Sequence, residues 1–179
     1  NNIKSLRDTL ELLDKEEVSQ AVELLHKANR IDFYGVAASQ LIAQDAQQKF
    51  MRINKLCTAY SDSHLQLTSA TTMTKGDVAV GISYSGETTQ TIEAIREAKK
   101  AGAVTIAITK YGNNTLKELS DISLSISSME SSIRSAATSS RISQLNVIDI
   151  LFTAVAAIDF EQSVEYLKKS RETINKTYR

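Results

Sequence analysis

The sequence predicts an α/β fold in which a five-stranded parallel sheet lies between two layers of helices. Short apolar segments rich in β-branched residues alternate with segments of helical periodicity, roughly every 20 to 25 residues. That alternation is typical of parallel sheets covered on both faces. The chain has no proline, so its turns depend on Gly, Asn and Ser. The expected strands are residues 31–35, 56–60, 77–82, 103–109 and 121–126.

Helices are expected before, between and after these strands. Ile3, Leu6, Leu10 and Leu13 form a narrow apolar stripe on the first helix. A second helix begins at a capping box around Asp14. This pair of helices either covers the sheet or packs against a second subunit, and the sequence leaves both open. The chain is expected to divide into a helical extension, an α/β domain and a C-terminal helix, at residues 1–28, 29–160 and 161–179.

Composition excludes several classes of partner. The formal net charge is zero and the pI is about 6.9, without the basic excess of a nucleic-acid-binding surface or the charge that attracts anionic membranes. No apolar run approaches the ~20 residues of a membrane span. The single cysteine, Cys57, fits a reducing compartment and is expected to be a buried structural thiol. We therefore expect a cytoplasmic chain, and its start at Asn1 indicates a fragment of a longer protein.

The stretch from Ser83 to Thr88 carries the clearest chemical signal. It follows an apolar strand and opens a helix, whose first N–H groups and dipole leave partial positive charge at that end. Ser83, Ser85 and Thr88 supply hydroxyls that can donate to phosphate oxygens, and Gly86 permits a tight loop. The alternative is that one hydroxyl merely caps the helix. Three hydroxyls around a glycine favour an anion site.

A second loop of suitable chemistry follows the first strand. Ligands of parallel sheets bind beyond the carboxyl ends of the strands, so the loop from Gly35 to Ser39 is expected to share one phosphate with loop 83–88. The sequence has neither Gly-x-x-x-x-Gly-Lys-Ser/Thr nor Gly-x-Gly-x-x-Gly, the two common nucleotide-binding patterns. His26 and His64 are isolated, without the spacing of metal ligands. We expect no metal ion and no cofactor.

Three segments together resemble the sugar isomerase (SIS) domain: Phe33-Tyr-Gly-Val-Ala-Ala-Ser39, Ile82-Ser-Tyr-Ser-Gly-Glu-Thr88 and Ala103-Val-Thr-Ile-Ala-Ile-Thr109. More narrowly, Ser139-Ser-Arg-Ile-Ser-Gln-Leu-Asn-Val-Ile-Asp149 is similar to the C-terminal effector domain of RpiR/MurR-type bacterial transcription regulators. The resemblance covers roughly residues 20–160 and implies a three-layer αβα sandwich of flavodoxin-like topology. One residue departs from the family pattern Gly-x-Gly-x-Ser. Ala37 replaces the second glycine, and its methyl group narrows the approach of a ligand.

The resemblance also implies which residues bind a phosphosugar. The phosphate would be held by the hydroxyls and backbone of Ser39, Ser83, Tyr84, Ser85, Gly86 and Thr88. The candidates for the sugar ring are His64, Glu87, Glu130 and Arg134. Each of these has an alternative reading. His64 is then a helix-start residue, Glu87 supports the start of a helix, and Glu130 with Arg134 forms a solvated i, i+4 pair.

For function, the resemblance implies a non-enzymatic sensor within a regulator of carbohydrate metabolism. A phosphorylated sugar, such as the amino sugar N-acetylmuramic acid 6-phosphate, would change DNA binding by an N-terminal helix-turn-helix domain outside this segment. The chain would form a homodimer or homotetramer, with no membrane contact. Two alternatives stay open. One is a sugar-phosphate isomerase or lyase that uses Glu130 or His64 as general base, and the other is an oligomerisation domain with a vestigial site.

Overall fold

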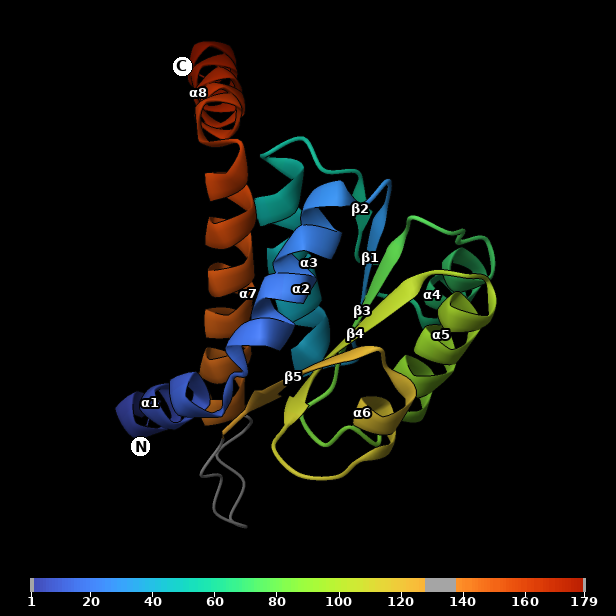
Figure 1. Ribbon diagram of the computed structural model, residues 1–179. Coiled ribbons are helices and arrows are strands. Elements are labelled where there is room, and N and C mark those ends of the chain that lie inside the picture. The colour runs from blue at the N-terminus through green and yellow to red at the C-terminus, as the bar shows by residue number, and fades with distance from the viewer. Residues whose placement is uncertain (1, 128–137, 179) are drawn as a thin grey trace.

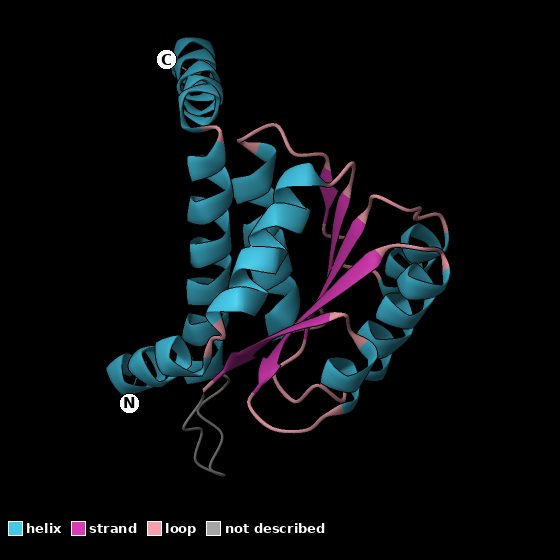
Figure 2. Cartoon of the chain, in the orientation of Figure 1, coloured by secondary structure: helices cyan, strands magenta, loops and turns pink. Residues whose placement is uncertain are grey.

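The computed structural model describes residues 2–127 and 138–178, which form one sheet between two helical layers (Figures 1 and 2). The strands are β1 (Ile31–Tyr34), β2 (Cys57–Thr58), β3 (Val78–Ile82), β4 (Val104–Lys110) and β5 (Ile122–Ile126). The helices are α1 (Asn2–Leu12), α2 (Lys15–Lys27), α3 (Ala38–Met51), α4 (Ser63–Thr71), α5 (Thr89–Lys100), α6 (Thr115–Leu119), α7 (Thr138–Ile158) and α8 (Phe160–Thr177).

The sheet confirms the predicted fold class. Its strands are all parallel, in the order β2-β1-β3-β4-β5. Because β2 lies on one side of β1 and β3 on the other, the direction of winding reverses between β1 and β3. Tyr34, the last residue of β1, pairs with Gly81 near the end of β3. In open parallel sheets, ligands bind at such a reversal, beyond the carboxyl ends of the strands.

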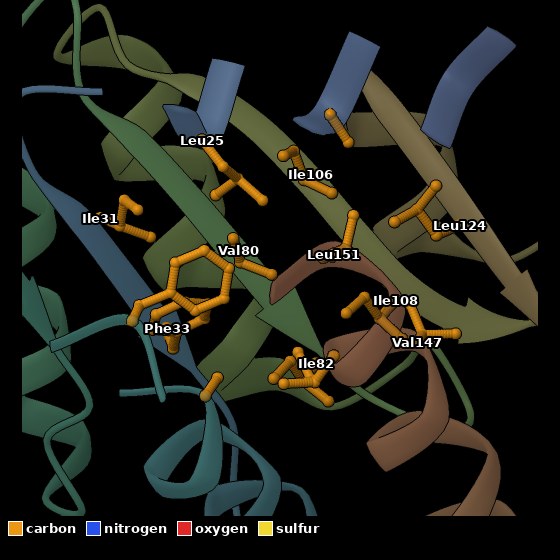
Figure 3. Packing of buried hydrophobic residues seen from close by; sticks show 14 of the residues in the cluster. Leu25, Ile31, Phe33, Val80, Ile82, Ile106, Ile108, Leu124, Val147 and Leu151 are labelled. Atoms are coloured by element: carbon orange, nitrogen blue, oxygen red, sulfur yellow. The ribbon is translucent and has the colours of Figure 1, made fainter. Parts of the chain in front are cut away.

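The larger core lies between the sheet and the layer formed by α2, α3 and α7. Phe33, Val80 and Ile106 point into it from three neighbouring strands (Figure 3). The ring of Phe50 on α3 lies 5.6 Å from that of Phe33 and 5.9 Å from that of Phe152 on α7. These contacts join both helices to the sheet, as expected for alternating side chains of a strand buried on two faces.

The opposite face of the sheet carries smaller side chains, Ala79, Gly81 and Ala107, under α4, α5 and α6. A Cβ atom added to Gly81 would lie 2.7 Å from the Ile95 Cγ1. Gly81 therefore allows α5 to pack closely on β3. This close packing fixes the first turn of α5 next to the end of β3.

A buried carboxylate joins three elements beneath this face. Asp32 on β1 is 0% exposed and accepts hydrogen bonds from the Tyr34 hydroxyl (2.8 Å), the Ser69 hydroxyl on α4 (2.6 Å) and the Thr58 hydroxyl on β2 (2.9 Å). The Arg30 Nε lies 3.3 Å from it. Burial, followed by the nearby Asp32 charge, raises the pKa of Tyr34 far above its ordinary value. The network fixes α4 on the sheet.

The structure shows the orientation of α1, which the sequence left open, and it shortens one expected strand. α1 turns Ser5 and Thr9 inward and leaves Ile3 and Leu10 70% and 57% exposed. The Thr9 hydroxyl explains this, because it donates to the Ser5 carbonyl (2.7 Å) and accepts from the Ser127 N–H (3.0 Å) at the end of β5. The second strand is only two residues long, not five, and lies at the edge of the sheet.

α7 is 21 residues long and is the one described helix whose length and composition would suit a membrane span. In the structure it packs against α1, α2 and α3 and against β5. Its buried residues include Ser143, Gln144 and Val147. It therefore serves as a helix of the protein core here.

The Asp32 network gives the first prediction. Replacing Asp32 by Ala leaves the Arg30 guanidinium and three hydroxyls without their shared acceptor, and breaking a buried ion pair costs roughly 3–5 kcal/mol. We expect the free energy of unfolding, measured by urea denaturation, to fall by at least about 3 kcal/mol. Glu11→Ala, at an exposed position of α1, is the matched control. A loss below about 1 kcal/mol would show that the network is not structurally important.

Candidate functional site

The two loops singled out by the sequence meet at the reversal point of the sheet. Residues 35–37 follow β1 and lead into α3, and residues 83–88 follow β3 and lead into α5. Because β1 and β3 are hydrogen-bonded neighbours, these loops emerge side by side at the carboxyl edge. The topology thus brings the predicted Ser39 and loop 83–88 to one place.

Loop 83–88 curls so that hydroxyls from its two ends meet. The Ser83 side chain is 2% exposed, and its Oγ lies 2.8 Å from the Thr88 Oγ1. The same Oγ accepts a hydrogen bond from the Gly86 N–H at 3.1 Å. The Ser85 Oγ accepts from the Glu87 N–H, also at 3.1 Å. Hydroxyls can rotate from acceptor to donor, so this cluster can receive the oxygens of an anion.

Thr88 bears on the alternative that the hydroxyls serve only as helix caps. It is the N-cap residue of α5, with extended backbone, yet its side chain makes no capping hydrogen bond. Asp14, Asp62 and Asn114 do cap α2, α4 and α6 through their side chains. The Thr88 hydroxyl lies against Ser83 instead. The first turn of α5, with its partial positive charge, thus lacks the side-chain cap that α2, α4 and α6 have, as do the starts of α3 and α8.

Neighbouring elements hold the loop in this conformation. Gly86 has φ +72°, and an added Cβ would lie 2.0 Å from the Asn114 Oδ1 at the start of α6. The Gly86 carbonyl accepts from the Leu116 N–H at 2.9 Å. The Tyr84 carbonyl accepts from the Lys110 N–H at 3.0 Å, where β4 ends. Both the conformation and the space require glycine at position 86.

Glu87 lies on the outer side of the loop. Its carboxylate accepts from the Thr115 N–H (2.9 Å) and hydroxyl (2.7 Å), at the first residue of α6. These two hydrogen bonds are the main reason that the pKa of Glu87 lies below its ordinary value, and the Lys110 charge lowers it further. Glu87 therefore supports a helix start, as one reading of the sequence had it. The helix is α6, which begins 28 residues later, rather than the α5 that directly follows the loop.

The first loop is bent at Ala37. Its backbone angles are φ 52° and ψ −119°, and the Ser39 N–H donates to the Val36 carbonyl at 3.1 Å. These features define a type II′ turn with Ala37 at the position that favours glycine. Ser39 then lies half-buried in the first turn of α3. Position 35 also requires glycine, because a Cβ added there would lie 2.6 Å from the Ser39 carbonyl oxygen.

A cavity of about 260 Å³ opens between the starts of α4 and α5. It is lined by Ser63, His64, Leu67, Thr89, Gln90 and Glu93. His64 reaches it because the Asp62 carboxylate caps α4 through the Leu65 N–H (2.9 Å). Its lining includes Thr89, which directly follows Thr88 in the chain, so the cavity and the hydroxyl cluster both lie at the start of α5. Of the other sugar candidates, Glu130 and Arg134 lie outside the described residues.

Two buried glutamines that the sequence did not single out hold these parts together. The Gln66 Nε2 on α4 donates to the carbonyls of Gly35 (2.9 Å) and Tyr60 (2.7 Å). The Gln40 Nε2 on α3 donates to the Ala59 carbonyl at 2.9 Å. Gln66 is 1% and Gln40 7% exposed. They tie the loops after β1 and β2 to α4, which carries His64. In the sequence, the one feature that could have identified these two glutamines is that each places an amide on the apolar side of its helix.

Cys57 lies in β2, away from both loops. Burial raises the pKa of its thiol to about 11. The group is therefore protonated at neutral pH, as a structural cysteine is. Among the described residues, no group of His, Cys, Asp and Glu is arranged to hold a metal ion.

The fold is that of a known family. The SIS domain model matches residues 24–154, so the chain belongs to the SIS domain family. An uncharacterized HTH-type transcriptional regulator of Caldanaerobacter subterraneus is 52% identical over 97% of this chain and 62% of its own length. The HTH-type transcriptional regulator RpiR of Escherichia coli K12 is 30% identical over 94% of this chain and 57% of its own. This chain thus spans about three fifths of the relatives it matches.

Solved structures agree with this assignment. The Vibrio vulnificus NanR protein complexed with ManNAc-6P superimposes with a TM-score of 0.91 and 26% identity, over 98% of this chain and 66% of that one. The sugar isomerase domain of an RpiR transcription factor from Sphaerobacter thermophilus superimposes with a TM-score of 0.87 and 18% identity, over 96% of this chain and 94% of that one. The second likeness shows the fold alone.

The Ala37 turn gives a prediction at the site. An alanine in a glycine-favouring conformation carries about 1–2 kcal/mol of strain, partly offset because glycine has more freedom when unfolded. Ala37→Gly should therefore raise the free energy of unfolding by up to about 1 kcal/mol. Ala38→Gly, in the next residue but inside α3, should lower it. Urea denaturation measures the free energy of unfolding of both variants. If Ala37→Gly lowered it as much as Ala38→Gly does, the turn at Ala37 would not be strained.

Proposed function

We propose that this chain is the effector domain of a bacterial helix-turn-helix transcription regulator and binds a sugar phosphate. The observation that carries this proposal is the hydroxyl cluster of Ser83, Ser85 and Thr88 at a helix start whose N-cap side chain makes no capping bond. Phosphates bind at such helix starts because the dipole and the backbone N–H groups favour negative charge. The likeness to NanR, complexed with ManNAc-6P, supports the same ligand class.

The phosphate would lie between the two loops. Ser39 would contact it from the first loop, and Ser83, Ser85, Thr88, the Tyr84 N–H and Gly86 from the second. Charge-assisted hydrogen bonds of ~1.5–3 kcal/mol each, set against ~4–15 kcal/mol for association, give micromolar to millimolar affinity. That range suits a sensor of metabolite concentration.

The sugar ring would occupy the cavity between α4 and α5. His64 and Gln90 offer polar groups there, and Leu67 offers an apolar wall on which an N-acetyl methyl group can pack. An amino-sugar 6-phosphate such as N-acetylmuramic acid 6-phosphate fits this mixture. Glu130 and Arg134 remain candidates for the same ring, and Glu87 is a weaker one because Thr115 occupies both its oxygens.

In the full-length regulator, the ligand would change DNA binding by an N-terminal helix-turn-helix domain. The proposed regulator is cytoplasmic, needs no cofactor or metal, and contacts DNA only through that domain. It would assemble as a homodimer or homotetramer. The proposed domain limits are residues 1–28 for the connecting helices, 29–160 for the SIS domain and 161–179 for the C-terminal helix.

A second candidate is a sugar-phosphate isomerase or lyase. The observation in its favour is that His64 and Glu93 line the same cavity, because such chemistry needs a general base near C1 or C2 of the sugar. Against it, the Glu93 carboxylate is already paired with Arg96 on α5. The sensor is therefore the better supported function.

Ser85→Ala tests the phosphate site. The change removes one charge-assisted hydrogen bond, so we expect at least a tenfold rise in Kd for N-acetylmuramic acid 6-phosphate or N-acetylmannosamine 6-phosphate. Calorimetry measures it, with Ser61→Ala, an exposed serine outside the site, as the control. Wild-type affinity in Ser85→Ala would remove this residue from the site. Failure of all phosphosugars to bind the folded wild-type protein would reject the proposed ligand class.

Product analysis separates sensor from enzyme. We expect the same phosphosugars to be recovered unchanged after incubation with the protein, because Glu93, the carboxylate that lines the proposed ring cavity with His64, is paired with Arg96. Chromatography of the sugars is the measurement. Isomerised or cleaved product at about 1 per second or faster, lost in His64→Gln, would establish the enzyme instead.

A further inference from the structure

The C-terminal helix α8 leaves the body of the protein. It stands beyond the end of α7, clear of the sheet (Figure 1), and Ser163 is its one buried residue. Its first half is anchored, since Leu167 packs on the core and the Asn54 Nδ2 donates to the Tyr166 hydroxyl at 3.2 Å. Residues 171–178 are all exposed. The last two turns thus have no surface of their own chain to pack against.

α8 nevertheless carries an apolar stripe that runs from its first turn into these last two turns. Phe160, Val164, Leu167, Ile174 and Tyr178 recur at the spacings 4, 3, 7 and 4, which place them on one side of the helix. Phe160, Ile174 and Tyr178 are 65%, 57% and 83% exposed. Helices are stabilised mainly by packing of such a face. A stripe that continues past the body therefore indicates a partner for α8.

The same chain has two neighbouring depressions on the outer side of α7. One depression, of about 450 Å³, is lined by Asp149, Ile150, Thr153, Ala154 and Ala157. A second, of about 480 Å³, shares Ala157 and continues around the bend into the first turns of α8. Small side chains form the floor, and carboxylates stand at the edge. We call this surface, within residues 149–165, the α7–α8 depression, and residues 166–178 the arm.

The depression and the arm carry opposite charges. Residues 149–165 contain four carboxylates and no cation, namely Asp149, Asp159, Glu161 and Glu165. The arm contains four cations and one carboxylate, namely Lys168, Lys169, Arg171, Lys176 and Glu172. Asp149 contacts Lys49 and Asp159 lies 3.5 Å from His26, but their side chains remain 54% and 66% exposed. The ion pairs of residues 2–127 and 138–178 include none of the arm's cations.

We propose that two copies of the chain form a two-fold symmetric dimer. The arm of each copy docks in the α7–α8 depression of the other. Ile174 and Tyr178 would cover the small side chains of the floor, and the arm's cations would face the acidic edge. Within one chain the two surfaces cannot meet, because α8 starts at the depression and leads away from it. One chain that carries both halves of a complementary pair forms a closed, isologous dimer. The inference specifies the surface of the proposed homo-oligomer and does not depend on the phosphosugar.

Charge reversal tests this pairing. The arm variant combines Lys169→Glu, Arg171→Glu and Lys176→Glu, and the depression variant combines Asp159→Lys, Glu161→Lys and Glu165→Lys. Sedimentation equilibrium should give wild-type protein twice the 19.7 kDa mass of one chain. Each variant alone should dissociate at least tenfold more readily, because like charges then face each other. An equimolar mixture of the two variants should form a heterodimer, since both contacts regain opposite charges.

The control variant combines Lys15→Glu, Lys75→Glu and Lys100→Glu, at exposed positions outside α7 and α8, and should dimerise as wild type does. Circular dichroism checks that each variant is folded. A monomeric wild-type protein, an arm variant as dimeric as wild type, or a mixture that stays monomeric would each overturn the proposal. Because no sugar phosphate is present, these outcomes are independent of the ligand site. Calorimetry on the same variants reports that site separately.

Discussion

The 2.8 Å contact between the Ser83 and Thr88 hydroxyls is the interaction on which the site depends. It joins the end of β3 to the N-cap of α5 and turns the Thr88 side chain away from the helix that it would otherwise cap. The loop can close in this way because Gly86 adopts φ +72° next to Asn114. The start of α5 is thus left without a side-chain cap, and partial positive charge at such a position favours an anion.

The rest of the structure holds this loop between fixed elements. Gly81 lets α5 pack closely on β3, and Glu87 and Gly86 bind the start of α6. On the other side, Asp32 and Gln66 fix α4 through a buried carboxylate and a buried amide. The helix that carries His64 therefore cannot shift relative to loop 83–88 without breaking buried hydrogen bonds. Such rigid support is what a site needs when it binds with modest energy per contact.

Local patterns were enough to predict the sheet and to single out the loop from Ser83 to Thr88. The apolar strands and the motif from Ser83 to Thr88 are contiguous in sequence, so periodicity and residue chemistry identify them. Contacts between distant segments were not predictable in this way. The pairing of Glu87 with Thr115 and the two glutamines under the loops depend on how α3, α4 and α6 lie on the sheet. A carboxylate or an amide in a helix has many other roles, so no local signal separates these residues.

α1 shows what an amphipathic pattern alone leaves undecided. Its leucine and isoleucine stripe was compatible with covering the sheet or with facing a second subunit, and in the structure Ser5 and Thr9 face the protein while Ile3 is exposed. The Thr9 hydroxyl, which caps the end of β5 through the Ser127 N–H, outweighs the stripe because an unpaired backbone N–H is costly to bury. α8 follows its pattern in its first half only. In both helices, an apolar face is left for contacts outside the single chain.

A crystal structure of the protein with an amino-sugar 6-phosphate bound is the most direct measurement of the central claim. The predicted result has phosphate oxygens within hydrogen-bond distance of the Ser85 and Thr88 hydroxyls, with the sugar ring beside His64. A phosphate bound elsewhere, with the contact between Ser83 and Thr88 unchanged and the cavity between α4 and α5 unfilled, would contradict it.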